Sequence, residues 1–326
     1  MVDVEVIGNA ETMSVGFVLS VAVLLGLLFF FYQQVRRPPG PAEWGKSPKW
    51  SKRVRVVLAL VPLFLGCLLF WAFFIEPNRL VTNEESITIS NWSKELSGLK
   101  IAVLSDIHAG SAFIDEAKLR LIVDRTNQLQ PDLIVILGDY ITGNGRTSRN
   151  VAPEVFAPQL KGFHAPLGVY SVLGNHDWWY NGKKVRDALE QNGIRVLDDE
   201  VVEVQFRGTT FWLAGLADLW TRPQRVESTI AKIPEGQTII ALTHNPDIFP
   251  RLPVRVKLLL AGHTHGGQVR LPFIGTVVEA SDYGERYVRG HVVEDGHDLF
   301  VTTGIGTSIA PVRFGVPPEI VLLTIN

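Results

Sequence analysis

The sequence predicts a layered α/β domain with stacked sheets, preceded by two membrane-spanning helices. Two long apolar runs lie before residue 80, and they explain why this 326-residue chain is 46% hydrophobic with a mean hydropathy of +0.17. Strands alternate with helices in the first half of the remaining chain, and strands dominate its second half. This order of elements is typical of an α/β domain whose sheets are stacked.

The first element predicted is a pair of transmembrane helices. Val15–Tyr32 is an apolar run of 18 residues without a charge, and Val54–Ile75 is one of 22 residues charged only at Arg55. At about 1.5 Å per residue they would span about 27 and 33 Å, against a hydrocarbon core of about 30 Å. Buried core helices are seldom apolar all round over such lengths. The acidic segment 1–14 and the lack of a clear cleavage site also argue against a signal peptide.

The linker 33–53 between the two runs predicts their orientation. It carries Glu43 as its only acidic residue against six basic ones, namely Arg36, Arg37, Lys46, Lys49, Lys52 and Arg53. Such a basic linker stays in the cytoplasm. In a bacterium the chain would therefore be a multi-pass inner-membrane protein, with everything after Ile75 on the outer, periplasmic side.

The charge of the remaining chain argues against nucleic acid as a partner. Eight of the 31 basic residues and five of the 33 acidic ones precede Leu80, which leaves 23 basic and 28 acidic side chains. Binding to a phosphate backbone needs a basic surface. The only cysteine, Cys67, lies in the second apolar run, so no disulfide can form within the chain.

The domain predicted at residues 80–326 begins with alternating elements. Pro131 ends its first helix and Gly193 its last. The predicted helices are 115–129, 152–160 and 183–192, and the predicted strands are 99–104, 132–137, 168–173, 210–214, 238–242, 256–260, 288–293, 299–302 and 320–325.

Metal-binding residue types follow the carboxyl ends of five of these strands. In chain order they are Asp106 and His108, Asp139, Asn175 and His176, His244, and His263 and His265. Ligands of open α/β sheets collect at that edge, so the five loops are expected to meet at one place. Each motif alone is more often a turn, a cap or a core histidine, and it is their combination in this order that indicates a metal site.

The donor types favour two divalent ions. In extended backbone, residues two apart, such as Asp106 and His108, point to the same face. Oxygen and imidazole donors without a thiolate suit Mn, Fe or Zn better than Ca or a structural zinc site. All of these residues except His176 are expected ligands. Seven ligands are too many for one such ion but suit two ions that share a carboxylate, hold a hydroxide between them and clamp a phosphoryl group.

This motif order, D-x-H, G-D, G-N-H-D, H and G-H-T-H, resembles the calcineurin-like metallophosphoesterase superfamily over about residues 99–326. The segments 262–268 and 304–319 look like its membrane-associated bacterial phosphodiesterase branch. The resemblance implies a four-layer α/β/β/α sandwich. It also implies one metal on Asp106, His108, Asp139 and His265, and a second on Asp139, Asn175, His244 and His263.

The resemblance further implies that His176 is a general acid or a donor to the phosphoryl oxygens. The residues support this, because a departing alkoxide needs a proton and histidine can supply one near neutral pH. A histidine that only orients a ligand is the alternative. Protein Ser/Thr phosphatases of the superfamily continue G-D with x-x-D-R-G, whereas Gly138-Asp139 continues Tyr-Ile-Thr-Gly. A protein phosphatase is therefore disfavoured, and the sequence does not identify what orients His176.

Other polar and aromatic residues near the motifs have more than one interpretation. Arg146 and Arg149 either contact the phosphate or are solvated loop charges. The run Trp178–Tyr180 walls the site, contacts lipid headgroups or packs in the core.

Three functions fit the sequence. The first is a metal-dependent phosphoesterase, expected to be a phosphodiesterase, that acts on phosphoesters including lipid-linked ones. The second is a UDP-2,3-diacylglucosamine pyrophosphatase of lipid A synthesis, against which the outward topology counts because its nucleotide substrate is cytosolic. The third is a non-catalytic scaffold, which would be expected to lose ligands that this chain keeps.

Overall fold

The computed structural model describes residues 52–142 and 151–326. The predicted span Val15–Tyr32 and the arginines Arg146 and Arg149 lie outside these ranges. The chain divides into two units, Met1–Ile75 and Glu76–Asn326, which are described separately.

The described part of the first unit is one apolar helix. Helix α2, Lys52–Phe70, continues into a π-helical turn, Trp71–Ile75, and covers the second predicted span. Among the described residues, one helical stretch, Leu60–Asn78, is long and apolar enough to cross a membrane by length and composition, with a mean hydropathy of 2.0. The first span stays a prediction.

The second unit is built on two six-stranded sheets and a small hairpin. The first sheet has the order β1 (Val81–Ile87), β14 (Glu319–Ile325), β2 (Leu99–Leu104), β3 (Leu133–Ile136), β4 (Val169–Ser171), β5 (Arg195–Val196). The second has the order β12 (Gly290–Glu294), β13 (His297–Val301), β9 (Val256–Ala261), β8 (Thr238–Leu242), β7 (Thr209–Gly215), β6 (Glu200–Phe206). The hairpin pairs β10 (Arg270–Leu271) with β11 (Gly275–Thr276).

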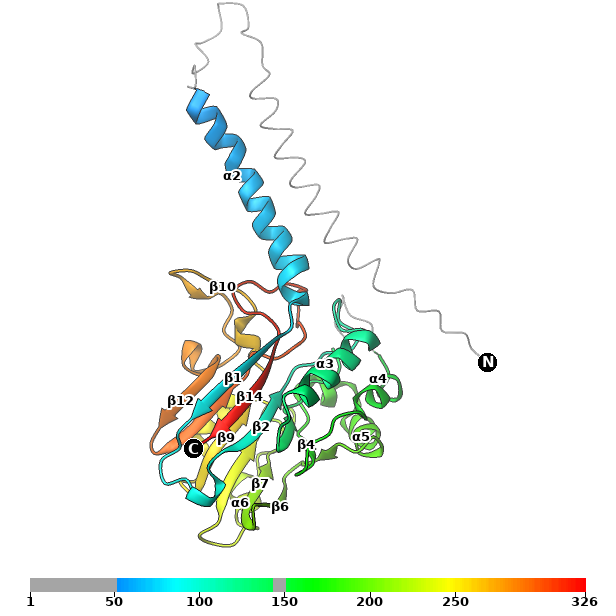
Figure 1. Ribbon diagram of the computed structural model, residues 1–326, viewed down its shortest axis with the longest axis vertical. Helices are drawn as coiled ribbons and strands as arrows, with labels where there is room; N and C mark the ends of the chain where they lie inside the picture. The colour runs from blue at the N-terminus through cyan, green and yellow to red at the C-terminus, as the bar shows by residue number, and fades with distance from the viewer. Residues whose placement is uncertain (1–51, 143–150) are drawn as a thin grey trace, which may run out of the picture. The chain divides into compact units, whose positions relative to one another are not determined.

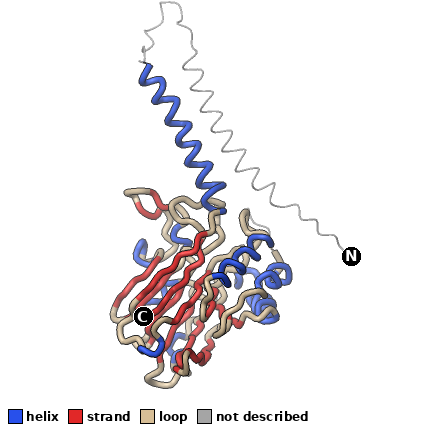
Figure 2. Tube along the Cα trace, viewed as in Figure 1, coloured by secondary structure: helices blue, strands red, loops and turns tan. Residues whose placement is uncertain are grey.

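The two sheets are stacked, and helices cover their outer faces (Figures 1 and 2). Alternate side chains of β2 and β3 point to opposite faces, as strand geometry requires. One set, such as Ile101 and Val135, packs against the second sheet, and the other set packs under helices. These helices are α3 (Glu116–Gln128), α4 (Pro153–Leu160) and α5 (Asn175–Gln191). A third core lies between the second sheet and the short helix α6 (Val226–Ile230) with neighbouring 3-10 turns. The stacked α/β arrangement agrees with the predicted fold class.

Strand directions bring the loops together at one edge. Strands β2 to β5 are parallel, and so are β7, β8, β9 and β13. The loops that follow β2 and β3 stay side by side beyond the strands, because His108 N donates to Asp139 O at 3.0 Å and Ala109 N to Tyr140 O at 2.7 Å. Each loop therefore starts from a rigid strand end.

Helix α5 differs from the prediction at its start. The helix expected from Lys183 is the second piece of α5, because Asn181 has extended φ and ψ of −174° and 89° and its side chain accepts from Lys184 N. The first piece begins at Asn175 and was not predicted. Its sequence, with three consecutive aromatic residues, lacks the helical apolar period that the prediction relied on. The expected ligand Asn175 is thus in the first turn of a helix instead of a loop.

Candidate metal centre

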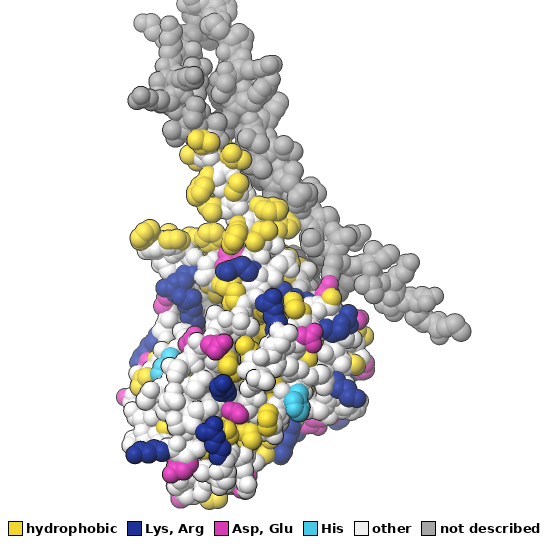
Figure 3. Space-filling view, viewed as in Figure 1, with side chains coloured by type: hydrophobic (Ala, Val, Ile, Leu, Met, Phe, Trp, Pro, Cys, Tyr) yellow, Lys and Arg dark blue, Asp and Glu magenta, His cyan; other side chains and the backbone are white. Residues whose placement is uncertain are grey.

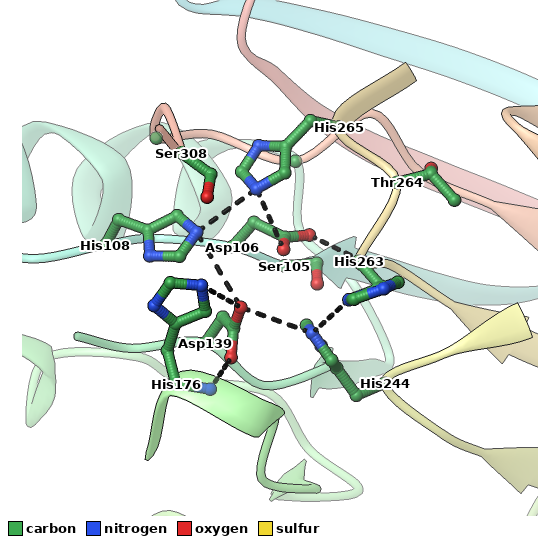
Figure 4. Close-up of polar contacts among 12 residues, drawn as sticks. Ser105, Asp106, His108, Asp139, His176, His244, His263, Thr264, His265 and Ser308 are labelled. Carbon is green, nitrogen blue, oxygen red and sulfur yellow. Dashed lines mark hydrogen bonds and ion pairs between the residues drawn. The ribbon is translucent and has the colours of Figure 1, made fainter. Parts of the chain in front are cut away.

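The structure brings six of the seven predicted ligands into one cluster of side chains in contact with one another (Figure 4). His265 Nε2 lies 3.3 Å from Asp106 Oδ1 and 3.1 Å from His108 Nε2. On the other side, His244 Nε2 lies 3.1 Å from His263 Nδ1. All these side chains are buried, and they come from the loops after β2, β3, β8 and β9.

Asp139 connects the two sides of the cluster. Its Oδ2 lies 3.3 Å from His244 Nε2 and 3.7 Å from His108 Nε2. Its Oδ1 accepts a hydrogen bond from His176 N at 2.9 Å. Gly174 makes this approach possible, since a Cβ there would lie 2.2 Å from Asp139 Oδ1.

The backbone at these ligands is not the extended backbone that the spacing argument assumed. Asp106, His108, Asp139, His263 and His265 all have φ between 49° and 71°. This left-handed region is sparsely used by residues other than glycine and costs about 1–3 kcal/mol per residue, so it is retained where the surroundings require it, as at functional sites. Asp106 and His108, and likewise His263 and His265, do point to the same site as predicted. Left-handed turns bring them there, not the alternating side-chain directions of an extended strand.

Backbone carbonyls fix the orientation of two imidazoles. A carbonyl can only accept, so Nδ1 of His108 donates to Ile141 O at 2.9 Å and Nδ1 of His244 donates to Leu137 O at 2.7 Å. In both rings Nε2 is then the atom that faces the cluster. Histidines that bind metals are oriented in this way, with the second nitrogen held by a carbonyl or carboxylate.

Burial and the two carboxylates set the protonation of the metal-free cluster. Burial lowers the pKa of His108 to about 4 and that of His263 to about 3, so both rings are neutral at physiological pH. Burial raises the pKa of Asp106 to about 6. At His244 burial is outweighed by the charge of Asp139 and by the hydrogen bond to it, which raise the pKa of His244 to about 10. In the metal-free cluster His244 therefore carries a proton at neutral pH.

Metal binding is expected to release this proton. A ligating imidazole must be unprotonated, so a cation displaces the proton from His244 at any pH below about 10. The apparent affinity for Zn²⁺ or Mn²⁺ should rise about tenfold per pH unit near neutrality. Isothermal titration calorimetry in two buffers of different ionisation enthalpy measures the protons released.

Two variants sharpen this measurement. His244→Asn should release about one proton fewer. His291→Asn should leave the count unchanged, because the His291–Asp298 pair, at 2.6 Å, lies outside the cluster. Proton release that is zero in the unsubstituted protein would contradict the assignment.

Unpartnered buried atoms show that the residues fit a bound cation. Asp106 Oδ1, Asn175 Oδ1 and His263 Nε2 are buried without a hydrogen-bond partner. Three groups of side chains have ligand atoms that lie within 4.8 Å of one another: Asp106, His108 and His265; His108, Asp139 and His176; and Asp106, Asp139 and His244. Orphaned acceptors of this kind are costly unless a cation or a donor satisfies them.

The structure answers what orients His176. Its Nδ1 donates to Thr142 O at 2.6 Å, and its Nε2 lies 4.0 Å from Asp139 Oδ2. The ring centroid is 4.9 Å from that of Trp179, which is exposed, whereas Trp178 and Tyr180 pack against the core. Within this aromatic run, Trp179 therefore borders the site, whereas Trp178 and Tyr180 are part of the core packing.

Asp177 has a positioning role that the sequence reasoning did not assign. Its Oδ1 accepts from Tyr140 N at 2.9 Å and Ile141 N at 3.3 Å, and its Oδ2 from Asp139 N at 2.9 Å and Gly174 N at 3.0 Å. This buried carboxylate therefore ties the loop that carries Asp139 to the start of α5. The signal available in the sequence was the acid directly after Asn175-His176.

Arg313 is a second residue that the sequence reasoning left without a role. It is fully buried, and its guanidinium donates to the carbonyls of Thr303, Gly304, Gly306 and Val316. Gly306 N in turn donates to Asp106 O at 2.6 Å. Arg313 thereby holds the loop after β13 against the loop that carries Asp106.

A loop after β7 closes the other side of the cluster. Trp220 lies with its ring 4.3 Å from that of His263, edge to face. Asp218 holds this loop through hydrogen bonds from Trp220 N at 3.2 Å and Thr221 N at 2.9 Å. No ligand-type motif marks this loop, which explains why the sequence reasoning missed it.

Comparison with known proteins agrees with this geometry. Residues 99–267 match the family model described as calcineurin-like phosphoesterase. The metallophosphoesterase YkuE of Bacillus subtilis is 31% identical over 78% of this chain and 89% of its own length. Phosphodiesterase YaeI of Escherichia coli is 29% identical over 69% of this chain and 81% of its own length. A zebrafish protein named as a transmembrane protein with a metallophosphoesterase domain is 31% identical over 75% of this chain and 56% of its own length.

Proposed function

Because the chain belongs to the calcineurin-like phosphoesterase family, we propose that it is a two-metal phosphodiesterase anchored in a membrane. The observation that carries this proposal is the position of Asp139. Its Oδ2 lies 3.3 Å from His244 on one side and 3.7 Å from His108 on the other, as a shared ligand of two ions requires.

The proposed ligand assignment is the one that the family resemblance implies, and the two sides of the cluster support it. One ion would be held by Asp106, His108, Asp139 and His265, and the other by Asp139, Asn175, His244 and His263. The donors are oxygens and imidazole nitrogens, which suits Mn, Fe or Zn. When bound, two such ions supply an activated water and neutralise charge on the phosphoryl group.

His176 is proposed as the general acid. Thr142 O holds its Nδ1, so Nε2 is the nitrogen that lies toward Asp139 and the cluster. The proton on Nε2 would pass to the leaving oxygen as the phosphorus–oxygen bond breaks. An alkyl ester has a strongly basic leaving oxygen that needs this proton. The relative YaeI is named a phosphodiesterase, which favours a diester as the substrate.

The proposed cellular location is supported by the basic linker in the sequence and by α2. The basic linker predicts a cytoplasmic connection between two spans. The catalytic domain would then lie on the periplasmic side of a bacterial inner membrane. Its substrate would be a phosphoester available there, including a lipid-linked one.

An activity screen with metal analysis of the same sample tests the proposal. We expect purified full-length protein to contain about two ions per chain and to hydrolyse bis-p-nitrophenyl phosphate, with activity lost on chelation and restored by Mn²⁺. A preference for UDP-2,3-diacylglucosamine would favour the pyrophosphatase instead. Failure on diesters, p-nitrophenyl phosphate and lipid pyrophosphates with metal bound would favour the scaffold.

A further inference from the structure

Two loops beside the metal centre carry unusually exposed apolar side chains. The hairpin β10–β11 and the residues after it expose Phe273, Ile274, Val277 and Val278, and the loop after β13 exposes Ile309. Ile309 is 92% exposed and Ile274 74%. We call these five residues the apolar rim. Hydrophobic side chains project at the position of β10 in the view shared by Figures 1 and 3.

The two loops form one structural element. Gln268 joins them, since its side chain donates to Ser308 O at 3.0 Å and accepts from Ser308 N at 2.6 Å. Arg270 N donates to Phe314 O at 2.7 Å. Single exposed hydrophobic residues are ordinary, but a group of them on connected loops marks an interaction surface.

The apolar rim borders the metal centre. The turn that holds His265 continues into Gly267, where a Cβ would lie 2.0 Å from Thr276 Cγ2 and 2.7 Å from Val278 O. The hairpin therefore packs directly on the turn. Ser308, next to Ile309, lies beside His108 and His265 in Figure 4.

The domain joins the apolar helical stretch at this same edge. Strand β1 begins at Val81 opposite Glu319, the first residue of β14. Strand β14 runs antiparallel to β2, with Val321 opposite Val103, so Val81 lies at the edge where β2 ends before Asp106. The stretch long and apolar enough to cross a membrane ends at Asn78, three residues earlier.

This connection limits how far the start of β1 can lie from the end of the apolar stretch. A residue of extended chain spans at most about 3.3–3.6 Å, so Asn78 and Val81 are separated by no more than about 10 Å. If the stretch spans the bilayer, the chain enters the sheet within about 10 Å of the end of that stretch, at the edge that carries the cluster. Val254 lies before β9, at the opposite edge of its sheet.

We propose that the apolar rim inserts into the interface of the membrane that anchors the chain, and that the substrate is a phosphoester headgroup of a lipid in that bilayer. The choice of substrate rests on the proposed activity, whereas the insertion rests only on the proposed membrane anchor. In the reaction, water oxygen bonds to phosphorus, the bond from phosphorus to the headgroup or lipid oxygen breaks, and that oxygen takes a proton. By inserting, the apolar rim would bring the cluster to the depth of the lipid headgroups.

Site-specific fluorescence tests the insertion without any activity. Cys67 is the only cysteine, so a Cys67→Ser background allows single labels. Phe273→Cys, Ile309→Cys and the control Val254→Cys would each carry an environment-sensitive nitrobenzoxadiazole label in full-length protein. The vesicles would contain phosphatidylethanolamine, phosphatidylglycerol and a doxyl-labelled lipid. We expect quenching of about twofold or more at residues 273 and 309 and none at residue 254, which is 69% exposed.

Two results would overturn the insertion. One is a label at residues 273 and 309 that responds to the doxyl lipid no more than the label at residue 254. The other is a signal that depends on the density of protein in the vesicle and not on the doxyl lipid, which would assign the apolar rim to contact between two copies of the chain.

A kinetic comparison tests the substrate. In the double variant Phe273→Asp/Ile309→Asp, kcat/KM for a p-nitrophenyl ester of phosphatidic acid in vesicles should fall about tenfold or more. Its kcat/KM for soluble bis-p-nitrophenyl phosphate should stay within about twofold, and Val254→Asp should change neither. An equal fall on both substrates would overturn the lipid assignment. If no substrate is hydrolysed at all, the proposed function fails, while the quenching still decides the insertion.

Discussion

Replacing Asp139 by asparagine is expected to lower kcat/KM for bis-p-nitrophenyl phosphate by on the order of 10³-fold. Two ions contribute several kcal/mol of charge stabilisation in the transition state, and each 1.4 kcal/mol is about tenfold in rate. Asparagine keeps the shape of the side chain. Its Oδ1 can still accept the hydrogen bond from His176 N, which is 2.9 Å long to Asp139 Oδ1 in the unsubstituted protein. It removes the negative charge that lies between His108 and His244. Metal analysis of the same sample should show that the variant has lost at least one of its ions.

A buried carboxylate outside the cluster provides the matched control. Asp298 is 2% exposed, lies near the amino end of β13 and pairs with His291. We expect Asp298→Asn to retain both ions and full activity, even if its melting temperature falls. If Asp139→Asn also kept its ions and its rate, a shared-ligand mechanism through this residue would be wrong.

Local sequence patterns predicted most of the fold. The strand at 99–104 and that at 238–242 match β2 and β8 residue for residue, because buried parallel strands are continuous apolar runs. Strand β1 was not predicted. Its sequence, Val-Thr-Asn-Glu-Glu-Ser-Ile, is polar since it is an exposed edge strand, and only its pairing with β14, more than two hundred residues away, makes it a strand.

The sequence predicted which side chains converge as the proposed ligands, whereas it did not predict the backbone geometry that brings them together. Strand ends followed by Asp, Asn and His predicted which side chains converge. The left-handed backbone at Asp106 and His263 was not predictable, because it depends on hydrogen bonds between loops that are distant in sequence, such as His263 N to Asp106 Oδ2 at 3.0 Å. Arg313 and Asp177 were missed for the same reason, since their partners are backbone atoms of other loops.

Replacing His176 by glutamine is expected to give a loss of rate that depends on the leaving group. General acid catalysis contributes about 10²–10⁴-fold, and it matters most when the departing oxygen is strongly basic. For an alkyl phosphodiester, kcat should fall within that range. For bis-p-nitrophenyl phosphate, whose leaving group is a weak base and needs no proton, the fall should be about tenfold or less. Backbone donation from residue 176 to Asp139 is unaffected by the substitution, so metal content should not change.

His297 offers a control that matches His176 in its local bonding. Both rings donate from Nδ1 to a backbone carbonyl, His297 to Val256 O at 3.0 Å and His176 to Thr142 O at 2.6 Å, but His297 lies at the amino end of β13, outside the cluster. His297→Gln should therefore leave the ratio of the two substrates' rates unchanged, whatever it does to stability. An equal loss on both substrates in His176→Gln would reject the proton donor. It would assign His176 instead to a contact with the phosphoryl oxygens, which acts on every substrate alike.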